Sequence, residues 1–241
     1  MILPRHAGAA RPAPARIDRR AFLLGLGALV AGCQTNASQP PIEPTAFAPV
    51  VDPYYRDMYA ALPNEQFPVP AIDVSQVDER YLRQLVDYNG GEAPGTVVVD
   101  TTDKFLYLVM EDGQAMRYGV GVGRQGLSWS GRAIIQMKRE WPRWTPTQNM
   151  IARDPELAQW ADGMEPGLTN PLGARALYLF ENGRDTLYRI HGTSEPWSIG
   201  QAMSSGCIRL FNQDIIDLYS RVPIGTRVRV LDHREPSEAW V

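Results

Sequence analysis

One segment of the chain has residue types and spacing suited to covalent catalysis. It runs from His191 to Arg209 and reads HGTSEPWSIGQAMSSGCIR. A cysteine attacks as its thiolate, and a neighbouring imidazole can take the thiol proton to give a thiolate–imidazolium pair. Of the three histidines, His6 lies in an N-terminal leader and His233 follows the last predicted strand. We therefore predict Cys207 as the nucleophile and His191 as its general base, which then protonates a leaving amine.

Two neighbours of Cys207 also fit acyl transfer. The turn Ser205-Gly206-Cys207 can present successive backbone N–H groups to the oxyanion of a tetrahedral intermediate. In an extended segment Arg209 points to the same face as Cys207, where its guanidinium could bind a substrate carboxylate. Each residue also has a structural alternative: Cys207 as a small buried residue, His191 as a core histidine and Arg209 as an ion-pair partner. Spacing alone leaves these alternatives open.

The sequence after residue 95 predicts a mainly β domain that would position these residues. Short β-branched or aromatic runs are separated by turn signals such as Asn182-Gly183, and one clear helix is expected over residues 213–219 with Asn212 as its N-cap. The expected strands cover residues 96–101, 104–109, 114–120, 133–139, 175–180, 185–190 and 227–231.

A loop of about 30 residues, Trp141 to Pro171, interrupts these strands. It begins with two closely spaced tryptophans, Trp141 and Trp144, and contains several prolines and a short helical pattern near residues 154–161. A loop of this length inside a compact domain predicts a lid or a binding wall. A surface excursion without a role is the alternative.

The first 32 residues read as an export signal. A basic stretch that ends in Arg19–Arg20 precedes eleven apolar or small residues, 21–31, a run too short to cross a bilayer and typical of a signal-peptide core. The arginine pair resembles a twin-arginine export signal, with an ordinary basic region as the alternative. The sequence LVAGC at residues 29–33 resembles a lipobox, so Cys33 is predicted to be lipidated; a chance cysteine is the alternative. A lipid on Cys33 would exclude the one available disulfide, to Cys207.

The remaining organisation follows from composition. Residues 33–92 are predicted to form a lipidated tether, rich in Pro, Ala and Ser up to about residue 70, with short helices over 54–62 and 78–86. Residues 93–232 form the predicted catalytic domain and 233–241 a C-terminal tail. Without the signal, 19 basic residues face 26 acidic ones, a net charge of −7. Such a balance argues against nucleic acid as a partner.

Several separated motifs resemble, in order, those of the L,D-transpeptidase catalytic domain, the YkuD-type family that includes ErfK, YbiS, YcfS and YnhG. They are HGT at residues 191–193 with SGCIR at 205–209, NPLGARALYL at 170–179, VVVDT at 97–101 and VGVG at 120–123. One position departs from the family, because many members carry a histidine two residues before the cysteine, where this chain has Ser205.

The resemblance implies a β-sandwich-like catalytic domain with few helices and a long lid loop. Its cysteine would attack a peptidoglycan tetrapeptide stem after the L-centre of diaminopimelate, release D-alanine, and pass the acyl group to an amine acceptor. By position, the Gly192 carbonyl would orient the imidazole of His191, and Arg209, Trp144 and Asn170 would bind substrate. The resemblance implies no metal and no cofactor.

The same resemblance implies partners and a location. The expected partners are peptidoglycan stem peptides, a membrane bound through Cys33, and an outer-membrane protein as a candidate acyl acceptor. The expected location is the periplasm, with the outer membrane favoured because Gln34 follows Cys33. Two alternatives stay open: a carboxypeptidase or endopeptidase on the same scaffold, in which water takes the acyl group, and a non-catalytic wall-binding lipoprotein in which Cys207 is only a core residue.

Overall fold

The computed structural model describes residues 52–124, 129–204 and 206–231. The chain divides into two compact units, Met1–Ala46 and Phe47–Val241, and every described residue belongs to the second. The predicted signal, Cys33, Ser205 and the C-terminal tail lie outside the described residues. Within the described ranges, no helix has the length and apolar character needed to cross a membrane.

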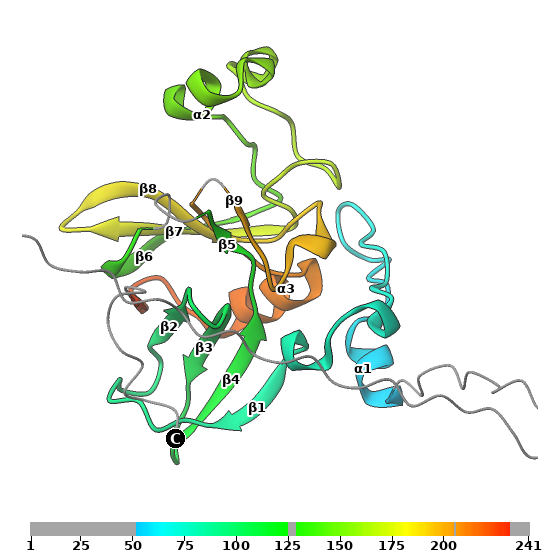
Figure 1. Ribbon diagram of the computed structural model, residues 1–241, viewed down its shortest axis with the longest axis vertical. Helices are drawn as coiled ribbons and strands as arrows, with labels where there is room; N and C mark the ends of the chain where they lie inside the picture. The colour runs from blue at the N-terminus through cyan, green and yellow to red at the C-terminus, as the bar shows by residue number, and fades with distance from the viewer. Residues whose placement is uncertain (1–51, 125–128, 205, 232–241) are drawn as a thin grey trace, which may run out of the picture. The chain divides into compact units, whose positions relative to one another are not determined.

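A nine-stranded sheet forms the body of the domain, in the order β1-β4-β3-β2-β11-β6-β7-β8-β10 (Figure 1). β11 pairs in parallel with β2, and β10 in parallel with β8. The strands are β1 (Gln84–Asp87), β2 (Val97–Asp100), β3 (Phe105–Val109), β4 (Gln114–Gly119), β6 (Gly131–Glu140), β7 (Arg175–Glu181), β8 (Arg184–His191), β10 (Ile208–Arg209) and β11 (Arg227–Val230). A second, two-stranded sheet pairs β5 (Val122–Gly123) with β9 (Ala202–Ser204). The predicted mainly β class is confirmed.

The large sheet is arranged as two layers that share one core. Figure 1 shows β1 to β4 in one layer and β6 to β8 in the other. At one edge the layers meet, because Gly121 and Arg209 exchange two backbone hydrogen bonds of 2.9 and 2.8 Å. The main core takes Leu106 from one layer, Leu177 from the other, and Ile215 from helix α3 (Asn212–Arg221). This arrangement matches the expected β-sandwich.

The segment before β1, residues 52–83, packs onto this body, and we call it the strap. It contains α1 (Pro53–Met58), η1 (Val74–Gln76) and η2 (Glu79–Tyr81). Tyr59 and Leu82 of the strap share an apolar cluster with Phe211. Glu65 accepts hydrogen bonds from the Arg175 guanidinium at both carboxylate oxygens, at 2.9 Å each. The described part of the expected tether is therefore folded onto the domain.

The predicted helix over residues 78–86 is wrong in its second half. Only the short 3-10 helix η2 forms, and β1 then pairs antiparallel with β4, with Leu85 opposite Met116. The apolar residues have helical spacing, but the unpaired edge of β4 offers backbone hydrogen bonds that a helix at this position would leave unmade.

Helix α3 also differs from the prediction at its first turn. Asn212 was expected to cap it, but Phe211 occupies the N-cap position and Asn212 is the first helical residue. The Asn212 side chain instead bonds to loop backbone outside the helix: Oδ1 accepts from the Ala174 N–H at 2.9 Å, and Nδ2 donates to the Thr193 carbonyl at 3.0 Å. A tertiary contact therefore takes the place of the local cap.

The long loop between β6 and β7 contains α2 (Gln148–Arg153) and η3 (Pro155–Trp160), and the second matches the short helix expected near residues 154–161. Figure 1 shows α2 extending away from the strands. Trp141, at the start of the loop, is only 4% exposed and packs with Val69 and Ala174. It anchors the loop in the core and contributes no lid surface.

Candidate active site

His191 is the last residue of β8 and is held on both sides. Ala176 of β7 and Arg209 of β10 are its register partners, and the side chain is 4% exposed. Its Nδ1 lies 2.5 Å from the carbonyl oxygen of Gly192. A carbonyl can only accept, so Nδ1 carries the hydrogen in this contact and Nε2 keeps the lone pair that can take a proton. The arrangement is that of an oriented general base.

Cys207 precedes β10 directly and is half-buried. Because Ile208 pairs with Ile190 and Arg209 with His191, the β8–β10 pairing brings the cysteine beside the strand that carries the histidine. The backbone N–H of Arg189, also on β8, is close enough to the thiol to lower its pKa. The two predicted reacting residues are thus brought to one edge of the sheet by a two-residue strand.

The charges around this pair favour its neutral form. The pKa of His191 is lowered to about 3, chiefly by burial and then by the Arg209 guanidinium, while the Gly192 carbonyl opposes the shift. Burial raises the pKa of the Cys207 thiol, and the Arg189 and Arg209 guanidinium groups only partly offset it. Both shifts therefore favour a thiol beside a neutral imidazole before substrate binds.

Gly206 has a backbone conformation that favours glycine. Its φ is +132°, in the region that L side chains rarely adopt, and it lies directly before Cys207. Ser205, the third predicted oxyanion donor, lies outside the described residues. The Gly206 and Cys207 N–H groups therefore stay predicted donors, and the glycine conformation is what permits the sharp turn into the cysteine.

Arg209 forms an ion pair that the sequence did not predict in detail. Its Nη1 lies 2.6 Å from Oε2 of Glu195, and the Arg209 side chain is 17% exposed against 45% for Glu195. A substrate carboxylate would therefore meet a guanidinium that already has a carboxylate partner. Glu195 was missed because a single acidic residue in a loop carries no pattern that points to a site.

The other two predicted substrate-binding residues belong to the long loop. Trp144 is half-buried, and its backbone forms an isolated antiparallel bridge with Met164. Asn170 is fully buried; its amide donates to the Pro142, Met164 and Glu165 carbonyls, at 3.1, 3.3 and 3.1 Å. Its amide oxygen accepts from the Leu172 N–H. This supports a role for Asn170 in holding the two ends of the loop together, in place of direct contact with substrate.

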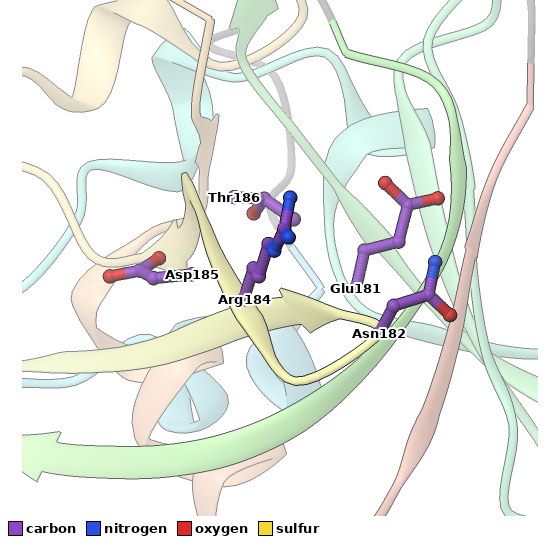
Figure 2. Close-up of a pocket in the computed structure, with 5 residues that line it drawn as sticks. All are labelled: Glu181, Asn182, Arg184, Asp185 and Thr186. Atoms are coloured by element: carbon purple, nitrogen blue, oxygen red, sulfur yellow. The ribbon is translucent and has the colours of Figure 1, made fainter.

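A pocket also opens at the β7–β8 hairpin, lined by Glu181, Asn182, Arg184, Asp185 and Thr186 (Figure 2). Figure 2 shows Glu181 and Asp185 on opposite sides of the hairpin. The predicted turn at Asn182-Gly183 is confirmed, with positive φ at both residues. None of the residues predicted for catalysis lines this pocket.

Comparison with known proteins identifies the family of the domain. Residues 94–230 match the L,D-transpeptidase catalytic domain model, YkuD. Probable L,D-transpeptidase ErfK/SrfK of Escherichia coli K12 is 36% identical over 140 residues, 56% of this chain and 44% of that protein. Probable L,D-transpeptidase YbiS of the same strain is 39% identical over 125 residues, 50% of this chain and 38% of that protein. The matches thus span less than half of the length of both relatives.

A solved structure from Brucella melitensis is also similar in sequence. It is described as a probable carnitine operon oxidoreductase, is 49% identical, and covers 66% of this chain and 99% of its own, with a TM-score of 0.45. That structural overlap is too small to bear on fold or activity. The matched domain covers more than half of the chain and includes every residue predicted for catalysis or substrate binding. The chain therefore belongs to the L,D-transpeptidase catalytic domain family.

Proposed function

We propose that this protein is an exported L,D-transpeptidase that uses Cys207 to form an acyl-enzyme with peptidoglycan tetrapeptide stems. The observation that carries the proposal is the pairing of β10 with β8. It sets Arg209 opposite His191 and brings Cys207 to the strand that ends in the histidine. Membership of the family supports the reaction class.

The first half-reaction can start from a thiol and a neutral imidazole. Nε2 of His191 takes the proton from Sγ of Cys207 as the sulfur attacks the carbonyl carbon after the L-centre of diaminopimelate. The carbonyl oxygen becomes an oxyanion, which the N–H groups of Gly206 and Cys207, with Ser205, would stabilise. The intermediate then collapses: the C–N bond to D-alanine breaks, and His191 gives its proton to the leaving amine. A thioester on Cys207 remains.

The second half-reaction regenerates the thiol. An acceptor amine attacks the thioester carbon, His191 removes a proton from the attacking nitrogen, and the C–S bond breaks with the proton returning to sulfur. In this scheme His191 never needs to be protonated before substrate binds, which agrees with a pKa lowered to about 3. The Gly192 carbonyl keeps Nδ1 protonated and Nε2 directed to the reaction, the role a carboxylate has in other triads.

The location is a separate part of the proposal. Export through the predicted signal, lipidation of Cys33 and attachment to a membrane, with the outer membrane favoured, would place the domain next to its polymer. Metabolic labelling with an alkyne fatty acid tests this step. The wild-type chain is expected to take up the label and Cys33→Ser to lose it, and equal labelling of both proteins would contradict the anchor.

The products of the reaction test the proposed activity. Full-length protein is incubated with disaccharide-tetrapeptide, and the products are identified by mass spectrometry. Cross-linked dimers with D-alanine in solution are the expected result. Tripeptides without dimers would indicate a hydrolase, in which water takes the acyl group. No D-alanine from folded protein would leave a non-catalytic wall-binding protein as the better reading.

A further inference from the structure

Asn212, at the start of α3, joins three separate parts of the backbone near the candidate site. The side chain is buried, and its amide both accepts and donates a hydrogen bond. Oδ1 accepts from the Ala174 N–H just before β7, and Nδ2 donates to the Thr193 carbonyl just after β8. The amide therefore links the first turn of the helix to the loop that follows His191.

The same side chain lies against the backbone of two glycines. A Cβ added to Gly192 would lie 2.3 Å from the Asn212 Oδ1, and a Cβ added to Gly173 would lie 2.3 Å from the same atom. Contacts this short exclude a methyl group at both positions without a shift of the surrounding atoms. The absence of side chains at Gly173 and Gly192 is thus what allows the Asn212 amide to reach its partners.

The contact bears on the histidine because Gly192 provides its hydrogen-bond acceptor. The Gly192 N–H donates to the Arg175 carbonyl at 3.0 Å, and the carbonyl of the next residue, Thr193, accepts from Asn212. The peptide unit that carries the Gly192 carbonyl therefore lies between two hydrogen-bonded peptide units. Its direction sets the direction of the imidazole through the 2.5 Å contact with Nδ1.

We infer that Asn212 is a positioning residue for the general base. It holds the Gly192–Thr193 backbone so that the Gly192 carbonyl keeps His191 in the tautomer and orientation that direct Nε2 to Cys207. The inference rests on the proposed function, since it assigns the reacting role to His191. The Asn212 side chain bonds to the Ala174 N–H and the Thr193 carbonyl, so we expect its effect to pass through the backbone beside the histidine.

A double-mutant comparison separates this role from simple support of the fold. Alkylation of Cys207 by iodoacetamide at pH 7 is followed at the Cys207 peptide by mass spectrometry, in full-length protein. We expect Asn212→Ala to slow it about 10- to 100-fold, because small misplacement of a catalytic group costs that much. In a His191→Ala background the same change is expected to slow alkylation less than about 2-fold, since the group it positions is gone.

Gln213→Ala is the matched control. Gln213 is the next residue of α3 and is also a buried amide, but its Nε2 donates to the strap carbonyls of Tyr59, Ala60 and Pro70. This variant is expected to lower the melting temperature and to leave alkylation unchanged. If it slows alkylation as much as Asn212→Ala does, the effect is general loosening and the inference is overturned.

Two further outcomes decide the inference. Equal losses from Asn212→Ala with and without His191, or no loss in either background, would overturn it. If Asn212→Ala does not fold, the isosteric Asn212→Asp, which keeps the acceptor for Ala174 and loses the donor to Thr193, is compared in the same two backgrounds with the same expected result.

D-alanine release is measured in parallel. Wild-type protein whose Cys207 is alkylated at the expected rate but which releases no D-alanine contradicts the proposed function and not the role of Asn212.

Discussion

Arg209 lies opposite His191 in the β8–β10 pairing, while its guanidinium is bonded to the Glu195 carboxylate at 2.6 Å. One arginine therefore contributes to two properties of the site. Its positive charge lowers the pKa of the imidazole, as the second cause after burial. Its guanidinium is also a candidate partner for a substrate carboxylate, which would compete with Glu195.

The pH dependence of Cys207 alkylation tests the first of these properties. The reactive imidazole is the neutral form, so reactivity falls as the pH drops through the His191 pKa, which is about 3. Arg209→Ala removes a positive charge, makes protonation easier, and is expected to move this fall to higher pH. Glu195→Gln removes the balancing negative charge and is expected to move it the other way. A fall at the same pH in all three proteins would contradict the charge effect.

Loss of the Arg209 guanidinium should also weaken substrate binding. A charge-assisted hydrogen bond is worth about 1.5–3 kcal/mol, so Arg209→Ala is expected to raise KM for the tetrapeptide stem at least about 10-fold. Steady-state D-alanine release as a function of stem concentration measures this. An unchanged KM would mean that the Glu195 ion pair is purely structural.

Gly206→Ala should lower activity through the backbone. The positive φ of +132° is strained for any residue with a Cβ, at a cost of about 1–3 kcal/mol. We expect a loss of at least about 10-fold in kcat, because the turn that carries Cys207 would move. Gly225→Ala is the control, because Gly225 also has a positive φ, +95°, but lies in the loop before β11. If both variants have the same melting temperature and lose kcat equally, movement of the turn at Cys207 is not the cause of the loss.

A buried carboxyl predicts an unusual dependence of stability on pH. Burial, with a smaller contribution from Asp217, raises the pKa of Asp214 to about 7. Arg83 and a hydrogen bond from Tyr59 only partly offset this rise. The folded protein then holds a proton that the unfolded chain releases above about pH 4, so this group's contribution to stability falls as the pH rises from about 4 to about 7. His191, with its lowered pKa, acts in the opposite direction over about pH 3 to 6.5.

Because the two groups oppose each other, wild type is compared with Asp214→Asn. We compare the free energy of unfolding of wild type with that of the variant at each pH. The difference, wild type minus variant, is expected to fall by up to about 1.4 kcal/mol per pH unit between pH 4 and 7, and to stay constant above pH 7. Denaturant titrations at fixed pH values provide the measurement. A difference that does not change with pH would show that Asp214 titrates normally.

The strap should contribute strongly to stability through Glu65. Its ion pair with Arg175 is largely buried, with side chains 18% and 9% exposed, and it also accepts from the Trp141 indole at 3.0 Å. Glu65→Ala leaves the guanidinium without this partner and is expected to lower the free energy of unfolding by about 3 kcal/mol. Glu165→Ala breaks an exposed pair with Arg143, 75% and 52% exposed, and should cost less than about 1 kcal/mol. Similar losses in both variants would mean that the strap is held weakly.

The main strands could be predicted because each is a short apolar or alternating run bounded by turn residues. All seven expected strands form, with ends that differ by at most two residues. β10 and β9 were missed because two or three residues carry no period, and yet β10 places Cys207 and Arg209. The helix expected over 78–86 failed because pairing with β4 overrides the local spacing.

The sequence indicates the residue types of the candidate site better than it indicates their environment. Cys207 and His191 come from a local motif, but the ion pair of Glu65 with Arg175 joins residues 110 positions apart. The contacts of Asn212 with Ala174 and Thr193 likewise depend on the closed fold. Burial, which lowers the pKa of His191 and raises that of Cys207, is a property of packing and not of spacing.

The proposed function depends above all on formation of the acyl group on Cys207. Full-length wild type and Cys207→Ala are mixed with a tetrapeptide stem, and D-alanine release and the mass of the peptide containing residue 207 are measured in the same samples. We expect D-alanine release and a tripeptide adduct on Cys207 in wild type, and neither in the variant. Release of D-alanine by Cys207→Ala at the wild-type rate would contradict the proposed function.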